Sequence, residues 1–205
     1  MATAKILLCA FCFALTGCSG GTERNYLAQP NAYHPIGTAL YVNDGRHILN
    51  FKTDHNVDEH YRRIVDAARK EIGTREGNVP NTGPKVSAYL SYVGIKTAAP
   101  WCAAWLSYVF GQAGYAQPKT AWCPSLFPAS RQVREARDGL VLGIYFAHLG
   151  RLGHCGIIER VNGSYIMSIE GNTSAANERD GDGVWRKLRH KRSIRCYADW
   201  IRKRN

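Results

Sequence analysis

The residues best suited to chemistry are a cysteine, a histidine and two polar side chains that follow them. Cys102 opens a long apolar run, and His154 stands at the start of a predicted strand. Glu170 and Asn172 lie at the end of the next predicted strand. A cysteine nucleophile needs a base for its proton and a third polar group that orients the imidazole. These four residues are therefore the candidate catalytic set.

Cys102 is a candidate nucleophile because of the predicted helix on which it lies. Residues 101–113 are apolar on almost every side, which predicts a buried central helix. Pro100 suits a position at or just before the first turn, and Gly114 supplies a left-handed stop. Free N–H groups and the helix dipole in the first turn favour a thiolate at Cys102. A buried cysteine is also often an inert core residue, and it is His154 downstream that favours the catalytic interpretation.

The hairpin that carries the other candidates can be tested for register. Its two strands meet around Asn162-Gly163. A plain two-residue loop there would turn Glu170 to the face opposite His154. A three-residue loop, or a bulge that restores the same parity, pairs His154 with Asn172 and Gly156 with Glu170. We therefore predict either a three-residue loop or a bulge, because both place His154, Glu170 and Asn172 on one side of the hairpin.

The remaining elements follow from hydrophobic periodicity and turn residues. The predicted helices span residues 58–72, 84–93, 101–113 and 130–137, and the predicted strands span residues 140–146, 154–161, 164–170 and 183–189. Residues 193–202 are expected to begin extended and end helical, and residues 38–42 and 48–51 to form a small hairpin. The expected fold is α+β, with N-terminal helices and a buried central helix packed on an antiparallel sheet.

The net charge of the chain indicates which class of partner it is expected to bind. Lys and Arg number 27 against 16 Asp and Glu, a formal net charge of +11 on 205 residues. Such a surplus favours an anionic partner or matrix, such as nucleic acid, a membrane surface or a cell-wall polymer. The basic run at residues 186–192 is most simply a solvated sheet edge that resists aggregation. Binding of an anionic wall polymer or membrane is the alternative.

The N-terminus indicates export. Residues 6–15 form an apolar run that is too short to span a bilayer but suits a signal-peptide core. Leu15-Thr16-Gly17-Cys18 resembles the bacterial lipoprotein processing box, which implies lipidation of Cys18; an ordinary cleavable signal is the alternative. We therefore expect a signal peptide at 1–18, a tether at 19–56, and an exported domain anchored by lipid to a bacterial membrane, facing the periplasm or cell envelope.

The remaining cysteines do not indicate a metal centre. Cys9 and Cys12 would be removed with the signal peptide, and no two of Cys102, Cys123, Cys155 and Cys196 have the CxxC spacing of a zinc or redox site, so neither metal nor cofactor is expected. An exported compartment permits disulfides. If Cys102 stays free, at most one pair can form among Cys123, Cys155 and Cys196.

Four motifs together resemble the cysteine, histidine-dependent amidohydrolase/peptidase (CHAP) domains, relatives of the NlpC-type cell-wall hydrolases. The motifs are Asn81-Thr82-Gly83-Pro84, Pro100-Trp101-Cys102-Ala103-Ala104-Trp105, Gly153-His154-Cys155-Gly156-Ile157-Ile158 and Ile169-Glu170-Gly171-Asn172-Thr173. The resemblance implies a papain-like catalytic domain at 57–205. It makes Cys102 the nucleophile, His154 the base, and Glu170 and Asn172 the orienting groups.

The same resemblance implies a substrate. Most members of the family cut amide bonds of peptidoglycan, either between muramic acid and the stem peptide or within stems and bridges. The expected function is thus a peptidoglycan amidase (N-acetylmuramoyl-L-alanine amidase) or endopeptidase that works through a cysteine thioester. The alternative is a catalytically silent wall-binding lipoprotein on the same fold. Nucleic-acid binding is disfavoured by export, and the oligomeric state stays open.

Several neighbouring residues have less certain roles. Cys155 replaces the small aliphatic residue that commonly follows the family's histidine, and alternation predicts a core thiol that points away from the catalytic side. His148 is a weaker rival base in a presumed loop. Trp101 and Trp122 are candidates to line a substrate groove, whereas Trp105 is expected in the core.

Overall fold

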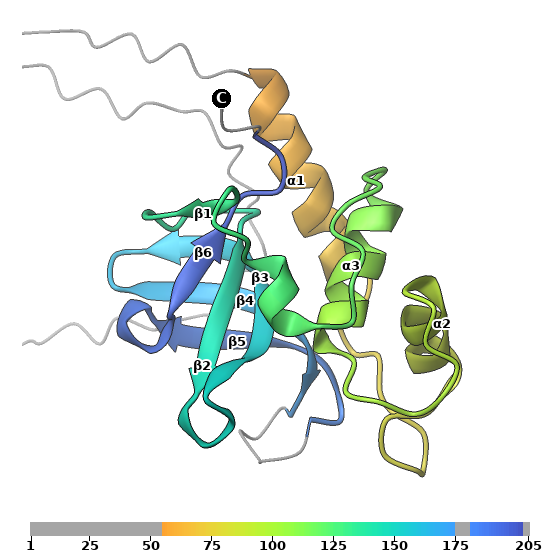
Figure 1. Ribbon diagram of the computed structural model, residues 1–205. Helices are drawn as coiled ribbons and strands as arrows, with labels where there is room; N and C mark the ends of the chain where they lie inside the picture. Colours follow the sequence, from red (N-terminus) through yellow and green to blue (C-terminus); the bar gives the residue numbers. More distant parts are fainter. Residues whose placement is uncertain (1–54, 175–180, 203–205) are drawn as a thin grey trace, which may run out of the picture. The chain divides into compact units, whose positions relative to one another are not determined.

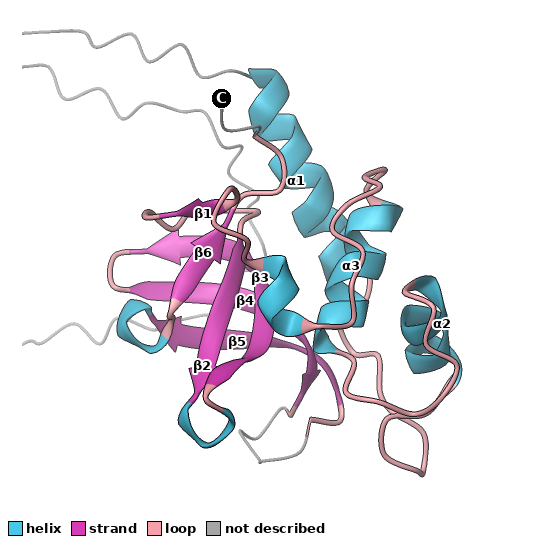
Figure 2. Cartoon of the chain, viewed as in Figure 1, coloured by secondary structure: helices cyan, strands magenta, loops and turns pink. Residues whose placement is uncertain are grey.

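Three α-helices and a six-stranded antiparallel sheet make up the part of the chain that the computed structural model describes, residues 55–174 and 181–202. The helices are α1 (His55–Arg69), α2 (Pro84–Tyr92) and α3 (Cys102–Gln112), and the strands are β1 (Gln132–Val133), β2 (Val141–Phe146), β3 (Arg151–Asn162), β4 (Tyr165–Thr173), β5 (Gly183–His190) and β6 (Cys196–Ala198). Short 3-10 helices lie at η1 (Cys123–Leu126), η2 (Ala147–Leu149) and η3 (Lys191–Ser193). The strand order is β1-β6-β2-β3-β4-β5, and the helices lie on one side of the sheet (Figures 1 and 2). The predicted α+β class is confirmed.

Part of the predicted N-terminal organisation lies outside the described residues. This applies to the signal peptide with Cys18, to residues 38–42 and 48–51, and to all but the last two residues of the tether, since residues 55 and 56 already belong to α1. Among the residues that are described, no helix combines the length and apolarity needed to cross a bilayer.

α3 is the central helix that its composition predicts. Eight of its eleven residues are buried, and it packs against α1, α2, β3 and β4. Trp101 takes the N-cap position, so Cys102 is the first helical residue. At the other end Gly114 adopts a left-handed φ of 91°, and the Tyr115 N–H donates to the Phe110 carbonyl at 2.9 Å. This pattern closes the helix as the sequence predicts.

The first helix is shifted relative to its prediction, and the second agrees with it. α1 begins three residues before Asp58 and ends at Arg69, three residues before the predicted end. Its predicted inward positions Tyr61, Ile64, Val65 and Ala68 are all buried. α2 begins at Pro84, as predicted, and ends one residue before the predicted boundary.

The β3–β4 hairpin adopts the predicted parity through a bulge. Asn162 pairs with Tyr165, so the loop has only two residues, Gly163 and Ser164. The register then shifts between Ile158 and Arg160, and Ile157 pairs with Ile169. One extra residue on β3 thus brings Gly156 opposite Glu170, where only the absence of a β-carbon leaves room for the Glu170 side chain.

Alternation along these strands separates two apolar clusters. Ile157 and Ile169 belong to the main core with α3, whereas Ile158 and Ile166 pack in a second cluster with Leu142 of β2. Gly171 shares the α3 side, where a β-carbon would lie 2.6 Å from Cγ of the buried Trp105 side chain. The hairpin therefore lies directly against the central helix.

Two predictions at the sheet's far edge are wrong. Residues 130–137 do not form a helix, because Gln132 and Val133 pair with β6 as strand β1. Tertiary pairing overrides a helical preference there. The segment 193–202 begins extended, as predicted, but its end is not helical. Asp199 instead accepts the N–H groups of Ile201 and Arg202 and holds a turn.

Candidate active site

A groove of about 810 Å³ opens at the N-terminal end of α3. Its walls come from the 76–81 loop, the ends of β2, β3 and β4, and β5. The residues that line it are Glu76, Pro80, Asn81, Pro100, Cys102, Ile144, Phe146, His148, Leu149, Arg151, Gly153, His154, Asn172, Thr173, Gly181 and Arg189. No group of three or more His, Cys, Asp or Glu side chains in the described part of the chain is arranged to hold a metal ion. The groove wall does contain side chains that can themselves act as nucleophile, base and cation.

Cys102 and His154 meet in this groove. The cysteine is the first residue of α3, and the histidine lies on β3. Both side chains are almost fully buried, with 7% and 6% exposure, and the thiol and imidazole share a hydrogen bond. The Nε2 atom of His154 lies 2.8 Å from Oε2 of Glu170. The structure thus brings three of the four candidates into one hydrogen-bonded chain.

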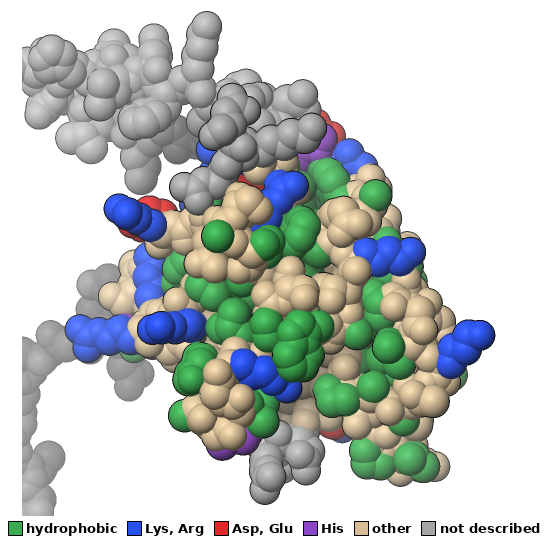
Figure 3. Space-filling view, in the orientation of Figure 1, with side chains coloured by type: hydrophobic (Ala, Val, Ile, Leu, Met, Phe, Trp, Pro, Cys, Tyr) green, Lys and Arg blue, Asp and Glu red, His purple; other side chains and the backbone are tan. Residues whose placement is uncertain are grey.

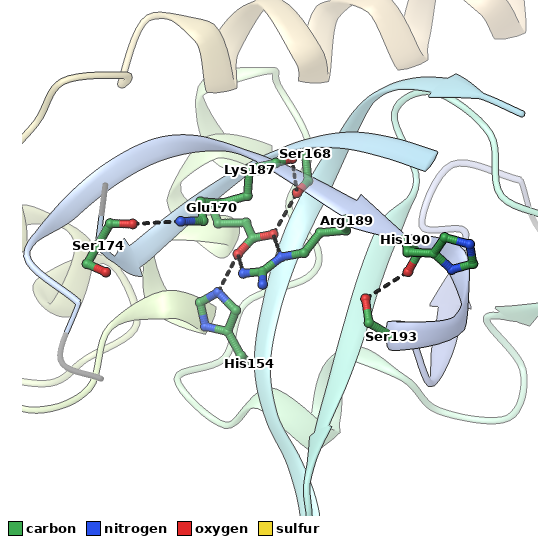
Figure 4. Close-up of polar contacts among 8 residues, drawn as sticks. All are labelled: His154, Ser168, Glu170, Ser174, Lys187, Arg189, His190 and Ser193. Carbon is green, nitrogen blue, oxygen red and sulfur yellow. Dashed lines mark hydrogen bonds and ion pairs between the residues drawn. The ribbon is translucent and has the colours of Figure 1, made fainter. Parts of the chain in front are cut away.

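Glu170 is a fully buried carboxylate with four hydrogen-bond donors (Figure 4). Ser168 Oγ donates to Oε1 at 2.6 Å, and Arg189 donates from Nε to Oε1 at 2.9 Å and from Nη2 to Oε2 at 2.6 Å. Burial by itself raises the pKa of Glu170, but Arg189 and His154 outweigh it and lower the pKa to about 2. Glu170 is therefore an anion that accepts the Nε2 proton of His154.

The environment favours an ion pair between Cys102 and His154. Burial lowers the pKa of His154, but its hydrogen bonds to Cys102 and Glu170 prevail and raise it to about 10. Hydrogen bonds from Cys123, from Cys155 and from His154 lower the pKa of Cys102, against the opposing effect of burial. Near neutral pH the pair is accordingly a thiolate beside an imidazolium.

Two further thiols lie beside Cys102, and no sequence pattern pointed to Cys123 as one of them. Cys123 begins η1 and Cys155 lies on β3, and both hydrogen-bond with Cys102. The hydrogen bond to Cys102 raises the pKa of Cys123, and burial raises that of Cys155, so both remain protonated donors. Cys155 is the core thiol that alternation predicts. It faces α3, however, and α3 carries Cys102, so it lies against the nucleophile instead of away from it.

Cysteine pairing differs from the disulfide that export permitted. Cys102, Cys123, Cys155 and Cys196 are all free thiols. Cys196 lies apart near Phe127, and burial raises its pKa to about 11. The described cysteines therefore act as thiols, and three of them gather at one site.

Asn172 and the rival histidine occupy secondary positions. Asn172 lines the groove with a left-handed φ of 55°, while the carboxylate that holds the imidazole is Glu170. His148 also lines the groove and stacks on Phe146, whose other neighbour is His154. Phe146 thus lies next to both imidazoles, and His154 is the one hydrogen-bonded to Cys102.

The two tryptophans suggested for the groove differ in position. Trp101 is fully buried, and its Nε1 donates to Glu76 Oε1 at 2.6 Å, so it belongs to the core and not to the groove wall. Trp122 is 51% exposed, and the Arg151 guanidinium stacks on it 4.2 Å from the ring centroid. Because Arg151 lines the groove, Trp122 stands at its margin. Trp105 is buried, as predicted.

Glu76 is a structural residue of the site that sequence reasoning missed. Its second carboxylate oxygen accepts the backbone N–H of Asn81 at 2.8 Å. One side chain therefore closes the 76–81 loop and fixes the indole that immediately precedes Cys102. The only signal for this role was an acidic residue in a loop between two predicted helices, and most such residues are simply solvated.

The basic run is only in part the solvated edge that its composition suggests, since Arg186 and Arg192 are exposed whereas Lys187 is buried. β5 is an edge strand, but Lys187 is buried and donates to the Ser174 carbonyl at 2.8 Å. Arg186 and Arg189 form bidentate pairs with the buried carboxylates Glu159 and Glu170. Three of the basic side chains thus pair with buried acceptors that only tertiary packing brings into reach, although the Arg186 side chain itself is exposed.

The depressed pKa of Cys102 leads to a prediction about reactivity. We expect iodoacetamide to alkylate Cys102 at a rate that changes less than about threefold between pH 6 and 8, because the thiolate is already formed. An ordinary cysteine gains roughly 75-fold over that interval. Peptide mass spectrometry resolves Cys102 from Cys123 and Cys155, which we expect to stay unmodified. A Cys102 rate that rises tenfold per pH unit would contradict the ion pair.

The chain is similar to solved structures, whereas no family model and no curated protein matches it. Two such structures are the crystal structure of Ly7917 and that of Ly7917 with the hydrolyzing product of MDP, at 14% identity and a TM-score of 0.40 in each case. The alignments cover 67% of this chain, 60% of the Ly7917 chain and 61% of the chain with the hydrolyzing product. The chain thus spans less than two thirds of either match, and the chemistry of the groove rests on its own side chains.

Proposed function

We propose that this chain is a papain-like cysteine hydrolase that cleaves amide bonds of peptidoglycan. The observation that carries the proposal is the buried chain of hydrogen bonds from Cys102 through His154 to Glu170 at the groove. A nucleophile, a base and an orienting carboxylate in that order are the requirements of thiol acyl transfer. The resemblance of the surrounding motifs to CHAP domains supports the same chemistry.

The reaction follows from the positions of these groups. The Cys102 thiolate attacks the amide carbonyl carbon and forms the C–S bond, while the oxyanion accepts from N–H groups in the first turn of α3. His154 gives its proton to the amine nitrogen as the C–N bond breaks. Water then attacks the thioester, His154 accepts a proton from that water, and the C–S bond breaks to regenerate Cys102. Glu170 holds the imidazole throughout.

The proposed substrate class agrees with the charge of the molecule. Lys and Arg are spread over the face shown in Figure 3, where Asp and Glu are scarce. Arg151 and Arg189 both line the groove. Peptidoglycan and its associated polymers carry carboxylates and phosphates that such a surface attracts. A lipid on Cys18 would keep the domain beside the wall.

The test uses the purified full-length chain in detergent micelles with isolated peptidoglycan. We expect the wild-type chain to release new amino groups, and the Cys102→Ala variant to release at least about 10³-fold fewer per unit time. Mass spectrometry of the products then identifies the new termini and separates an amidase from an endopeptidase. If neither form releases amines but both sediment with peptidoglycan, the chain is a wall-binding protein and the enzymatic proposal fails.

A further inference from the structure

We propose that Arg189 is a positioning residue of this site, which keeps Glu170 ionised and in place while His154 is neutral. The inference rests on the proposed function, because it concerns the steps of that reaction. It follows from the geometry of the buried carboxylate and from the charges that the reaction leaves around it.

The contact between Arg189 and Glu170 has the form of a fixed clamp. Two guanidinium nitrogens meet two carboxylate oxygens at 2.9 and 2.6 Å, and Figure 4 shows the guanidinium beside the carboxylate, with the His154 ring close to both. Bidentate pairing defines the plane of a carboxylate as well as its charge. Ser168 adds a third donor. Glu170 Oε2 is shared by Arg189 and His154, so the position of the clamp sets the position of the imidazole.

The charges that face Glu170 come from every element around it. His154 approaches from β3, Arg189 and the more distant Lys187 from β5, and Ser168 from its own strand β4. Cys102 of α3 faces the imidazole on its far side. Before acylation these groups contain two strong anions, Cys102 and Glu170, opposite two close cations, His154 and Arg189. The site is then balanced.

Acylation removes the charges of Cys102 and His154 from this group. The Cys102 charge disappears into a neutral thioester, and His154 becomes neutral when it protonates the leaving amine. Glu170 is then a fully buried anion whose only close cation is Arg189 among the described residues. A buried carboxylate without a cation takes up a proton, and a protonated Glu170 no longer accepts the Nε2 proton of His154. Arg189 thus preserves the oriented base that must activate water in the second half of the reaction.

The first test needs no substrate. Without Arg189 the buried Glu170 takes up a proton, so in Arg189→Gln the imidazolium of His154 loses the carboxylate that stabilises it and the pKa of Cys102 rises. We expect the acidic limb of the alkylation rate of Cys102 by iodoacetamide to move to higher pH by about one unit. At a fixed pH on the acidic limb, where the rate is proportional to the thiolate fraction, the alkylation rate of Cys102 in the variant is expected to be about tenfold lower than in wild type.

The chain contains a matched control three residues away on the same strand. Arg186 clamps the buried Glu159 through the same two nitrogens, at 2.7 and 3.0 Å, but Glu159 contacts Arg69 instead of a histidine. Arg186→Gln therefore removes an equivalent ion pair and leaves the alkylation profile of Cys102 unchanged. If Arg189→Gln also leaves the profile unchanged, Arg189 has only a structural role and the proposal is overturned.

Two further variants keep the test decisive if Arg189→Gln folds poorly. Arg189→Lys retains the charge without the fork, so we expect less than half of the shift. In a Glu170→Gln background no carboxylate remains to be held, and adding Arg189→Gln is expected to leave the profile where Glu170→Gln places it. A further shift in the double variant would show that Arg189 acts independently of Glu170, which contradicts a positioning role.

The second test follows the reaction itself. Quenched mixtures of Arg189→Gln with isolated peptidoglycan fragments are expected to contain a larger fraction of Cys102 thioester, detected by intact mass spectrometry, than wild-type mixtures. The reason is that deacylation slows more than acylation. If wild type yields neither thioester nor products, the proposed function fails, while the alkylation profiles still decide the role of Arg189. If wild type turns over and the variant accumulates no additional thioester, the assignment to the second half of the reaction is wrong.

Discussion

Replacing His154 with alanine is expected to lower the rate of peptidoglycan amide cleavage by at least about 10³-fold. In the proposed reaction His154 stabilises the Cys102 thiolate, protonates the leaving amine and accepts a proton from the attacking water, and it is the imidazole bonded to both Cys102 and Glu170. The rate of amine release from isolated peptidoglycan measures the loss. Alkylation of Cys102 near pH 6 is expected to fall with it, because the thiolate loses its cation.

His148 supplies the comparison for that experiment. It lies in the same groove and stacks on Phe146, as His154 does, but it has no bond to Cys102 or Glu170 among the contacts of the described residues. We expect His148→Ala to reduce amine release by less than about tenfold and to leave the alkylation profile of Cys102 in place. Equal losses in the two variants would mean that the base has been assigned to the wrong histidine.

The second large effect is expected from Gly156→Ala. A β-carbon at this position would lie 2.6 Å from Cγ of Glu170 and 3.0 Å from the backbone oxygen of Ile169. The backbone is fixed in the sheet, so the carboxylate must move. A displacement of about 1 Å in a catalytic group can cost about 10²-fold in rate, and overpacking costs about 1–3 kcal/mol of unfolding free energy. Amine release and thermal unfolding measure the two losses separately.

Gly163→Ala separates the catalytic loss from the loss of stability. Gly163 lies in the hairpin loop with a φ of 54° and open space around its α-carbon. A left-handed alanine costs about 1–2 kcal/mol, which overlaps the expected cost at Gly156, but no contact connects it with Glu170. We expect amine release to be unchanged in this variant. Wild-type turnover in Gly156→Ala, or a loss of turnover in both variants, would argue against the packing of Glu170 against Gly156.

Local pattern was a good guide where one element fixes the position of a residue. The apolar run after Pro100 specifies a buried helix whatever it packs against, so Cys102 falls at its start. Strand alternation has a period of two, which let the register of the β3–β4 hairpin be tested before its turn was known. The turn itself had two solutions of equal parity, and the fold adopts the one with a bulge before Arg160.

Pattern was a poor guide where contacts join distant segments. Residues 130–137 have helical character, but the strand Cys196–Ala198 recruits Gln132 and Val133 into the sheet. Trp101 has the chemistry of a groove residue, but Glu76 accepts its indole N–H and holds it in the core. The sequence gives the side chain in each case, but it does not show which distant residue contacts that side chain and so determines its role.

Periodicity within single elements was enough to specify the helix that carries Cys102 and the α+β class, whereas the shared side of His154 and Glu170 also required the assumption that the polar groups of the hairpin gather on one face. Packing between elements, in contrast, places Cys123 and Cys155 against the nucleophile and makes Arg189 clamp the buried carboxylate. The difference arises because a buried charge or thiol takes its properties from its neighbours. Those neighbours are chosen by how η1, β3 and β5 pack around α3, and the order of residues along the chain does not specify them.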